Sequence, residues 1–417
     1  MKLREKLITL SAVALTTVTL AACGSSSSSS NGGGEAKTIT IWSSSTGPDG
    51  QKIKNTVNKY NKTDPKYPVK VLTMKGETMN SKLATGGKSG KGLPDVAMIA
   101  SEQVRQFVSQ GMVQSWSPYL KGTAVKSSNY VKAAWQTGTV KGKQYGVPAD
   151  MGTWILFYNK DLVAKYAPHA LDDNVVTYKE IQDAGTKAKS DGVYATSNDW
   201  SMQNWSNIYM QMGGGLNDTG KVNVNNKTAW AATDLMKGLY DKGYMVPKGQ
   251  DALKDFANGK LMFMPEGTWM IAQVQGYKNI NWGVTFTPQV NAKKIVNGTG
   301  AGQFALMKTK PDQSAAKKKG MVKFFSWLQT NQLEWLKSGV NSPSLKMQQV
   351  AAYKKMPQYF LISSQQGQDA LKVVRNDGIS YAYGEIDSRA WDMIQGKAPV
   401  KDTFKTIQQT VDQKLGQ

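Results

Sequence analysis

Residues 38–42 read Thr-Ile-Thr-Ile-Trp, and this alternation of β-branched residues predicts a strand. After it, apolar residues recur through positions 53–60 at the spacing of one helix face. A second short strand is expected at residues 69–72 and a buried one at residues 95–99. Such alternation of strands and helices predicts βα units on a largely parallel sheet, and hence an α/β fold.

The same alternation runs on through the chain. A continuous apolar strand is expected at residues 154–158, and Thr177 with Glu180 forms a capping box at the start of a helix. Further strands are expected at residues 261–264 and 304–306, followed by helical segments. With 417 residues, of which 40% are hydrophobic, the chain is longer than one core usually serves, so we expect two lobes.

The start of the chain has the pattern of an export signal. A basic beginning precedes an apolar run that ends at Leu20 and is too short to span a membrane. Small residues then lead to Cys23, the only cysteine in the chain. This arrangement resembles a bacterial lipobox, in which the cysteine is lipidated and begins the mature protein. We therefore expect a signal peptide at residues 1–22 and, at residues 23–37, a lipidated Cys23 with a Ser/Gly-rich tether.

The chain is strongly basic, with 52 Lys and Arg residues against 30 Asp and Glu and a formal net charge of +22. The lysines are scattered, and their densest run, residues 317–319, falls on a helix expected over residues 314–330. We interpret that run as a solvated helix face and do not expect a nucleic-acid partner. A field of this sign favours attraction to the anionic outer surface of a cell.

Sequence motifs for catalysis are missing. The only histidine, His169, lies in a loop-like context, and no Gly-x-Ser-x-Gly, His-Glu-x-x-His or Walker-type glycine motif occurs. A single cysteine cannot build a cysteine zinc site, so we expect no metal, no cofactor and no catalysis. One alternative from another class stays open, a surface-anchored glycoside hydrolase, because the carboxylate pair of such an enzyme is defined only in space.

Aromatic and amide side chains gather instead at predicted loops and strand ends. Sugars present apolar C–H faces, which aromatic rings cover, and hydroxyl rims, which amides and carboxylates satisfy. At strand ends such groups would line the crevice in which open α/β sheets bind ligands. The residues of this kind are Trp42, Trp154, Trp200, Gln203, Asn204, Trp205, Glu266 and Trp269.

Five short motifs, taken in order, resemble the extracellular solute-binding proteins of ABC importers, in the group that binds sugars and glycerol phosphate. The resemblance covers nearly the whole exported part of the chain. The motifs are an opening strand and Gly-rich turn at residues 39–50, Leu83-Ala84 with Leu93-Pro94-Asp95-Val96, Gly146-Val147-Pro148 with residues 156–161, residues 256–260 with Gly267-Thr268-Trp269, and the glycines of residues 298–302.

This resemblance implies a periplasmic-binding-protein-like fold, with two α/β lobes, crossing hinge strands and a ligand cleft between them. One lobe would comprise residues 38–147 plus 302–338, and the other residues 148–300 plus 339–417. The implied function is to capture a sugar or oligosaccharide, close on it by a hinge motion and deliver it to a permease powered by a cytoplasmic ATPase. The protein would act as a monomer, lipid-anchored on the extracytoplasmic face of the cell membrane.

Ligand-binding positions are implied in the same way. Glu102 matches a carboxylate that follows the third strand, and we expect the N-terminus of its helix to keep it ionised. Trp205 and Trp269 are expected to stack on sugar faces, and Tyr383 to donate or stack where relatives carry an arginine. The full predicted set is Trp42, Ser43, Thr78, Glu102, Gly152, Trp205, Gly267, Thr268, Trp269, Gly300 and Tyr383.

Departures from the family pattern bear on the ligand. Family members that bind glycerol phosphate need an arginine, and Tyr383 stands at the corresponding position here. Val340 stands where such members have an aromatic residue. Without a guanidinium group a phosphate loses its best bidentate partner, so a neutral sugar is favoured. Arg375 or Arg389 could substitute in space. A binder of glycerol phosphate or of a glycerophosphodiester therefore stays open, as does a ligand-binding partner of a membrane sensor.

Overall fold

The computed structural model describes residues 37–215 and 220–416. The predicted signal peptide at residues 1–22, Cys23 and all of the tether except Lys37 lie outside this part of the chain. Within it, no helix is both long enough and apolar enough to cross a membrane.

The described residues build a mixed sheet whose main path runs β2-β1-β3-β10-β7-β8. β1 (Ile39–Ser43) lies in the middle of a parallel trio, between β2 (Val69–Thr73) and β3 (Val96–Ala100). A helix separates each of these strands from the next along the chain, as βα units require. The trio confirms the three strands predicted from the opening of the sequence.

Two long strands carry the sheet beyond this trio. β10 (Asn297–Met307) pairs antiparallel with β3, and β7 (Gly146–Asn159) pairs antiparallel with β10. Farther along, β7 also pairs antiparallel with β8 (Phe263–Gly267) and β9 (Trp282–Phe286). The expectation of a largely parallel sheet is therefore wrong beyond the trio and a short β10–β11 pair, because β7 and β10 run past each other in opposite directions.

Short strands and helices complete the fold. The short strands are β4 (Val113–Gln114), β5 (Thr139–Val140), β6 (Lys143–Gln144) and β11 (Leu371–Lys372). The helices before β7 are α1 (Gly47–Asn61), α2 (Gly76–Ser89), α3 (Val104–Ser109), α4 (Ser117–Leu120) and α5 (Lys132–Thr137). The helices after it are α6 (Lys160–Tyr166), α7 (Tyr178–Ala188), α8 (Ser201–Gln211), α9 (Lys227–Asp241), α10 (Ala252–Ala257), α11 (Ile271–Val274), α12 (Ala315–Asn331), α13 (Leu333–Leu336), α14 (Ala351–Lys354), α15 (Gln365–Ala370), α16 (Ile379–Ile394) and α17 (Val400–Lys414).

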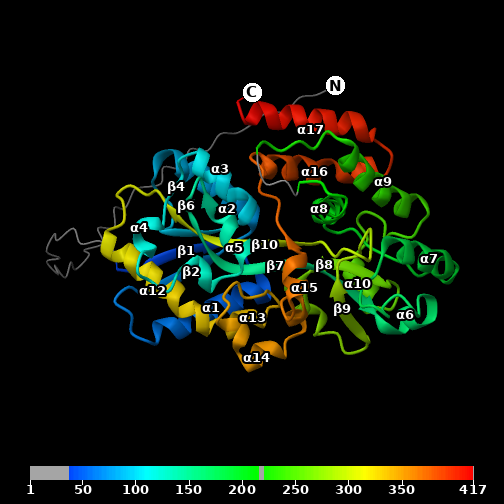
Figure 1. Cartoon of the computed structure of the whole chain (residues 1–417), viewed down its shortest axis with the longest axis horizontal. Helices are drawn as coiled ribbons and strands as arrows, with labels where there is room; N and C mark the ends of the chain where they lie inside the picture. Colours follow the sequence, from blue (N-terminus) through cyan, green and yellow to red (C-terminus); the bar gives the residue numbers. More distant parts are fainter. Residues whose placement is uncertain (1–36, 216–219, 417) are drawn as a thin grey trace, which may run out of the picture. The chain divides into compact units, whose positions relative to one another are not determined.

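The helices fall into two groups (Figure 1). α1 packs against β2, α12 and α13, beside the parallel trio. α8, α9, α16 and α17 pack against one another, and α8 also contacts β10. The first group shares an apolar core that includes Ile39 and Phe304, and the second a core that includes Trp205 and Phe404. Because the first core also reaches Phe256 and the described residues hold a third, smaller core, the cores alone do not fix the lobe boundaries, which stay a prediction.

Helix α12 corrects one interpretation of the sequence. Lys317 and Lys318 are buried, and Lys319 is the exposed member of the run. Lys317 Nζ lies 2.9 Å from Asp95 Oδ1, and Lys318 Nζ lies 2.9 Å from Asp312 Oδ2. Each buried ammonium group is thus paired with a carboxylate from outside the helix, because an unpaired charge would be too costly to bury.

Helix starts follow the predicted signals. The Thr177 hydroxyl accepts from the Glu180 amide at 3.2 Å, and the Glu180 carboxylate accepts from the Thr177 amide at 2.7 Å. Ser314 caps α12 in a similar way, accepting from the Lys317 amide at 3.1 Å. The capping box predicted for α7 is confirmed.

Candidate ligand-binding cleft

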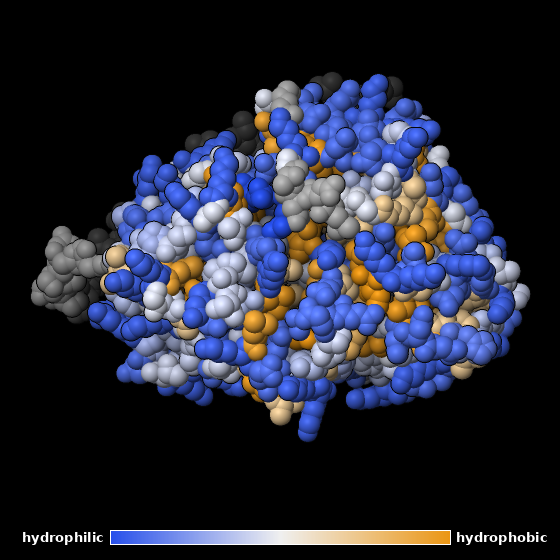
Figure 2. All heavy atoms as spheres, in the orientation of Figure 1, coloured by the Kyte–Doolittle hydropathy of each residue, from blue (hydrophilic) through white to orange (hydrophobic). Residues whose placement is uncertain are grey.

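A cavity of about 720 Å³ opens where the crossing strands pass between the two groups of elements. β7 and β10 supply its floor, with residues that include Gly152 and Gly300. The loop before α1 and the end of β3 line one side, and α8, the segment after β8 and α16 line the other. Figure 2 shows a mostly hydrophilic surface on which hydrophobic residues gather near the middle of the view.

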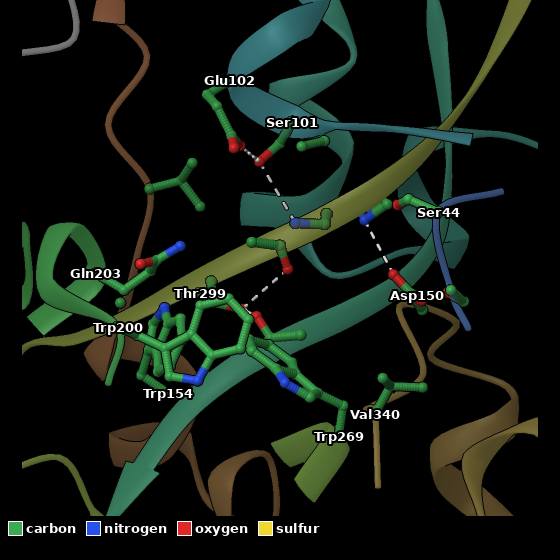
Figure 3. Close-up of a pocket in the computed structure, with 18 of the residues that line it drawn as sticks. Ser44, Ser101, Glu102, Asp150, Trp154, Trp200, Gln203, Trp269, Thr299 and Val340 are labelled. Carbon is green, nitrogen blue, oxygen red and sulfur yellow. Dashed lines mark hydrogen bonds between the residues drawn. The ribbon is translucent and has the colours of Figure 1, made fainter. Parts of the chain in front are cut away.

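Three indole rings form one side of this cavity, and we call Trp154, Trp200 and Trp269 the tryptophan wall (Figure 3). The ring centroids lie 4.9 Å apart for Trp154 and Trp269, 5.8 Å for Trp200 and Trp269, and 6.0 Å for Trp154 and Trp200. Because the rings pack against one another, no ligand group fits between them. They present a shared apolar surface rather than a cage.

Two glycines allow the Trp269 ring to lie where it does. A Cβ atom on Gly267 would come within 2.2 Å of that ring, and a Cβ atom on Gly152 within 3.1 Å. Gly152 lies on β7, so the indole packs directly over strand backbone. In the Gly-Thr-Trp motif, Gly267 therefore leaves room for the indole, and the ring of Trp269 lines the cavity.

Carboxyl groups occupy the opposite side. Asp150 is buried on β7, and its Oδ1 accepts from the Gly302 amide at 3.0 Å, next to a register shift between β7 and β10. Burial and the negative charge of nearby Asp49 raise the pKa of Asp150 to about 7. Asp49, in the first turn of α1, also has its pKa raised by burial. Asp49 and Asp150 both line the cavity. Among the described residues, no basic side chain hydrogen-bonds to either of them.

Glu102 lines the cavity just after β3. Ser101 Oγ donates to Glu102 Oε2 at 3.3 Å and accepts from the Ala301 amide at 3.4 Å, which links β3 to β10 (Figure 3). Burial raises the pKa of Glu102. Loss of hydration thus opposes the stabilisation expected from the helix N-terminus, and the ionised state of Glu102 stays a prediction.

Tyr383 reaches the cavity from α16. Its hydroxyl lies 2.8 Å from Ser206 Oγ on α8, so the two helices are joined at the cleft wall. Burial, with a smaller effect from the negative charge of Glu102, raises the pKa of Tyr383 far above its ordinary value. Tyr383 is therefore a neutral phenol that can share a hydroxyl hydrogen bond with a ligand.

A third chain segment joins β7 and β10 at the floor. The Met151 amide donates to the Asn341 carbonyl at 2.8 Å, and the Asn341 amide donates back to Met151 at 2.9 Å. On the other side of β7, Gly152 is paired with Gly300 of β10. Three crossing segments of this kind form a hinge, since few backbone torsions need to change for the two sides to move.

Five predicted ligand-binding residues line the cavity, and six do not. The lining residues are Glu102, Gly152, Trp269, Gly300 and Tyr383, whereas Trp42, Ser43, Thr78, Trp205, Gly267 and Thr268 lie outside the lining. Whether the five contact a ligand stays a prediction.

Trp205 is the clearest correction. Its ring is 1% exposed and stacks between Tyr209, at 4.7 Å, and Phe404, at 5.6 Å. The indole nitrogen donates to the Ala229 carbonyl at 3.2 Å. Trp205 therefore belongs to the core of the second helix group, because it lies on the face of α8 that packs on α9 and α17.

The other five residues have structural surroundings. Trp42 packs against a third, smaller apolar core, and the buried Ser43 hydroxyl donates to Met98 Sδ at 3.8 Å. Thr78 is exposed on α2. Thr268 is fully buried and its hydroxyl accepts from the Thr153 amide at 3.4 Å, while Gly267 only makes room for Trp269.

Several lining residues were not predicted as ligand contacts. Trp154 and Trp200 had been singled out as aromatic residues at strand ends and loops, and Asp150 lies two residues after Pro148 of the Gly-Val-Pro motif. Lys372 carried no sequence signal and is the one basic residue among the described residues that line the cavity. Arg375 and Arg389 are not in the lining, and Arg389 pairs with Glu385 at 3.2 Å.

Metal chemistry finds no support in the described part of the chain. No group of three or more His, Cys, Asp or Glu side chains there is arranged to hold a metal ion. A hinged cleft with an aromatic wall and a polar wall instead defines a protein that binds a small molecule between two lobes.

Comparison with known proteins gives the family. The family model described as bacterial extracellular solute-binding protein matches residues 55–360. That match spans most of the chain, and the protein belongs to this family.

Curated relatives carry names that refer to oligosaccharides. A galactooligosaccharide-binding protein of Bacillus subtilis (strain 168) is 27% identical over 325 residues, which cover 74% of this chain and 72% of the relative. A maltooligosaccharide ABC transporter solute-binding lipoprotein of Streptococcus pneumoniae (strain ATCC BAA-255 / R6) is 25% identical over 332 residues, covering 72% of each chain.

Solved structures share the fold at low sequence identity. An ABC substrate-binding protein from Listeria monocytogenes in complex with cycloalternan is 20% identical, with a TM-score of 0.74 over 91% of this chain and 99% of the other. A protein from Mycobacterium tuberculosis in complex with glycerophosphocholine is 18% identical, with a TM-score of 0.73 over 92% and 99%. These likenesses confirm the predicted binding-protein fold.

Proposed function

We propose that this protein is the solute-binding receptor of a bacterial ABC importer and that its solute is an oligosaccharide. The observation that carries the proposal is the tryptophan wall facing Asp49, Glu102 and Asp150 across a cavity of about 720 Å³. Aromatic rings cover the apolar faces of sugar rings by dispersion contact, and carboxyl groups accept from sugar hydroxyls. The oligosaccharide-binding names of relatives support the same class of solute.

A neutral sugar suits the cavity better than a phosphorylated one. Its described lining holds Lys372 but no arginine, so a phosphate would lack a bidentate partner. Asp49, Glu102 and Asp150 offer oxygen atoms that can share hydrogen bonds with sugar hydroxyls, and they supply no positive charge for an anion. A glycerophosphodiester is the second candidate, supported by likeness of fold to a protein in complex with glycerophosphocholine.

A thermal-shift screen of saccharides and glycerophosphodiesters tests the ligand class. Bound ligand at a hundredfold excess over Kd stabilises the native state by about 2.7 kcal/mol, which a melting curve resolves readily. We expect neutral oligosaccharides to raise Tm in wild type and in the surface control Lys319→Gln, but not in Trp269→Ala. A shift with phosphodiesters alone would reassign the ligand class, and no shift with either would refute the proposed function.

The protein is proposed to catalyse nothing, in keeping with a family of binding proteins. A surface glycoside hydrolase would release reducing sugar from the same oligosaccharides. We expect none to appear when purified protein is incubated with any saccharide that raises its Tm. Turnover of such a saccharide would contradict the assignment as a receptor.

Its partners are proposed to be a membrane permease, with a cytoplasmic ATPase, and the membrane itself through a lipid on Cys23. The pattern around Cys23 and the lipoprotein name of one relative support the anchor. Metabolic labelling with a fatty acid should mark the wild type, and Cys23→Ala should lose both label and membrane retention. A labelled Cys23→Ala protein would rule out this attachment site.

A further inference from the structure

Side chains of α3 and α16 meet across the two walls of the cleft. α3 begins two residues after Glu102, which lines one wall, and α16 carries Tyr383 of the other wall. Arg105 Nη1, on α3, donates to Oδ1 of Asp377, just before α16, at 3.0 Å. This ion pair joins the two walls outside the crossing segments that form the floor.

Two more side-chain hydrogen bonds accompany the ion pair. The Ser380 hydroxyl of α16 donates to Gln106 Oε1 of α3 at 2.8 Å. Gln110, which follows α3, donates through Nε2 to the Tyr381 hydroxyl at 3.4 Å. We call these three contacts together the α3–α16 bridge, and its residues are Arg105, Gln106, Gln110, Asp377, Ser380 and Tyr381.

Both ends of the α3–α16 bridge lie one helical turn from a residue of the cavity lining. Arg105 is three residues after Glu102, and Ser380 is three residues before Tyr383. Residues at this spacing lie on the same face of a helix. A movement that brings Glu102 and Tyr383 toward one ligand therefore also brings the partners of the bridge together.

The main chain of Asp377 belongs to the second helix group. Its amide donates to the Gly220 carbonyl at 3.1 Å, and its carbonyl accepts from the Val222 amide at 2.9 Å. The next residue, Gly378, has a φ of 85°, and a Cβ atom there would lie 2.8 Å from Leu415 Cδ1. Because this backbone is fixed on its own wall, the carboxylate of Asp377 moves relative to α3 when the walls move.

The ion pair of the α3–α16 bridge is open to solvent. The side chains of Arg105 and Asp377 are 31% and 55% exposed. Ion pairs at such positions are weak, and dissolved salt screens them. A contact of this strength can favour one position of a hinge without locking it, and its contribution falls as the ionic strength rises.

We propose that the α3–α16 bridge forms as the cleft closes and stabilises the closed receptor, so that ionic strength tunes the affinity for an uncharged saccharide. The inference rests on the proposed function, because it assigns the bridge to the form that holds the solute. A contact present only in the binding form raises the apparent affinity of every ligand of that form. A neutral sugar carries no charge for salt to screen, so a salt dependence of its binding originates in the protein.

The first test needs no saccharide. The double variant Arg105→Cys, Asp377→Cys, in a Cys23→Ala background, offers one thiol on each wall to a short bismaleimide cross-linker. We expect cross-linking to reduce the radius of gyration measured by small-angle scattering. An unchanged radius in the fully cross-linked protein would show that the two helices stay together whatever the cleft does. That result, or a failure to cross-link, would overturn the proposal.

The second test measures affinity by calorimetry with the neutral oligosaccharide that gives the largest thermal shift. We expect the wild type to bind about threefold more weakly in about 0.5 M NaCl than at low salt. Arg105→Gln should show a similar loss at low salt and little further loss at high salt. In that background Asp377→Asn should have no additional effect. A wild-type affinity independent of salt, or additive losses in the two variants, would overturn the proposal.

Lys237→Gln is the matched control, because Lys237 forms an ion pair of similar exposure with Asp241. Their side chains are 33% and 51% exposed, but both residues lie on α9 and the pair does not cross the cleft. This variant should keep the wild-type affinity and salt dependence, and a loss equal to that of Arg105→Gln would overturn the proposal. If no saccharide binds the wild type, the proposed function fails, while the cross-linking test still decides whether the walls close at the bridge.

Discussion

Two tryptophans of this chain, Trp205 and Trp269, differ in their environment. Trp205 and Trp269 were both expected to stack on sugars, yet Trp205 is buried between Tyr209 and Phe404 while Trp269 lines the cavity. The difference lies in partners that come from distant parts of the sequence. Mutation separates the two environments.

Trp205→Ala should destabilise the fold without a specific effect on the ligand. Removing a large buried aromatic side chain leaves a cavity and typically costs about 3–5 kcal/mol. We expect that loss in urea unfolding of the protein without ligand, with Trp269→Ala losing much less. An equally stable Trp205→Ala protein with weakened saccharide binding would return Trp205 to the site.

Glu102→Gln tests the carboxylate at the end of β3. The change keeps the shape and removes a negative charge that burial disfavours, so stability should barely move. A hydrogen bond to a charged group contributes about 1.5–3 kcal/mol, so saccharide affinity should fall roughly ten- to a hundredfold. Wild-type affinity by calorimetry in a folded variant would place Glu102 outside the site.

At the scale of elements, α12 is tied to the sheet by charge as well as by apolar packing. Lys317 pairs with Asp95, which also accepts from the Thr40 amide at 2.7 Å and from the Thr40 hydroxyl at 2.9 Å. The carboxylate thus joins α12, the start of β1 and the residue before β3. Such a buried network is sensitive to the loss of one partner.

Asp95→Ala should therefore destabilise the protein by about 3–5 kcal/mol, because it leaves the Lys317 ammonium buried without a counter-ion. The matched control is Lys319→Ala, on the same helix but exposed, which should change the unfolding free energy by less than about 0.5 kcal/mol. Chemical denaturation measures both. Equal stability of the two variants would show that the pair does not hold α12.

For the whole molecule, acids whose pKa is raised make stability depend on pH. The pKa of Asp150 is raised to about 7, that of Glu266 to about 8 and that of Asp199 to about 6. At pH values above the ordinary pKa range of carboxyl groups, the folded state therefore binds more protons than the unfolded state. The contribution of these acids to the free energy of unfolding is fully present at pH values below that range. It is lost as the pH rises through their raised pKa values.

We expect the Tm of the protein without ligand to fall between pH 5 and pH 8, and the double variant Asp150→Asn, Glu266→Gln to show a flatter profile. Acids whose pKa is lowered, such as Glu334 at about 2, titrate below this window and do not mask the effect. A thermal melt at each pH measures the slope. A Tm that rises over the window in wild type would contradict the assignment of these acids as protonated in the fold.

Local pattern by itself determined much of this protein. The β-branched run at residues 38–42, the capping box at Thr177 and the spaced apolar positions of α1 specify structure through contacts within a few residues. The ordered motifs gave the family, and with it five residues that line the cavity. Each of these inferences rests on short-range geometry or on a resemblance carried by contiguous residues.

Only the tertiary structure decided which polar and aromatic side chains are buried and with whom. Lys318 donates a hydrogen bond to Gln114, which lies 204 residues away in the sequence, and pairs with Asp312. These two partners allow the ammonium group of Lys318 to be buried. The antiparallel passage of β7 and β10 likewise brings Asp150 to Gly302 and creates the cavity floor. Burial and charge pairing depend on contacts distant in sequence, and periodicity within one segment carries no information about them.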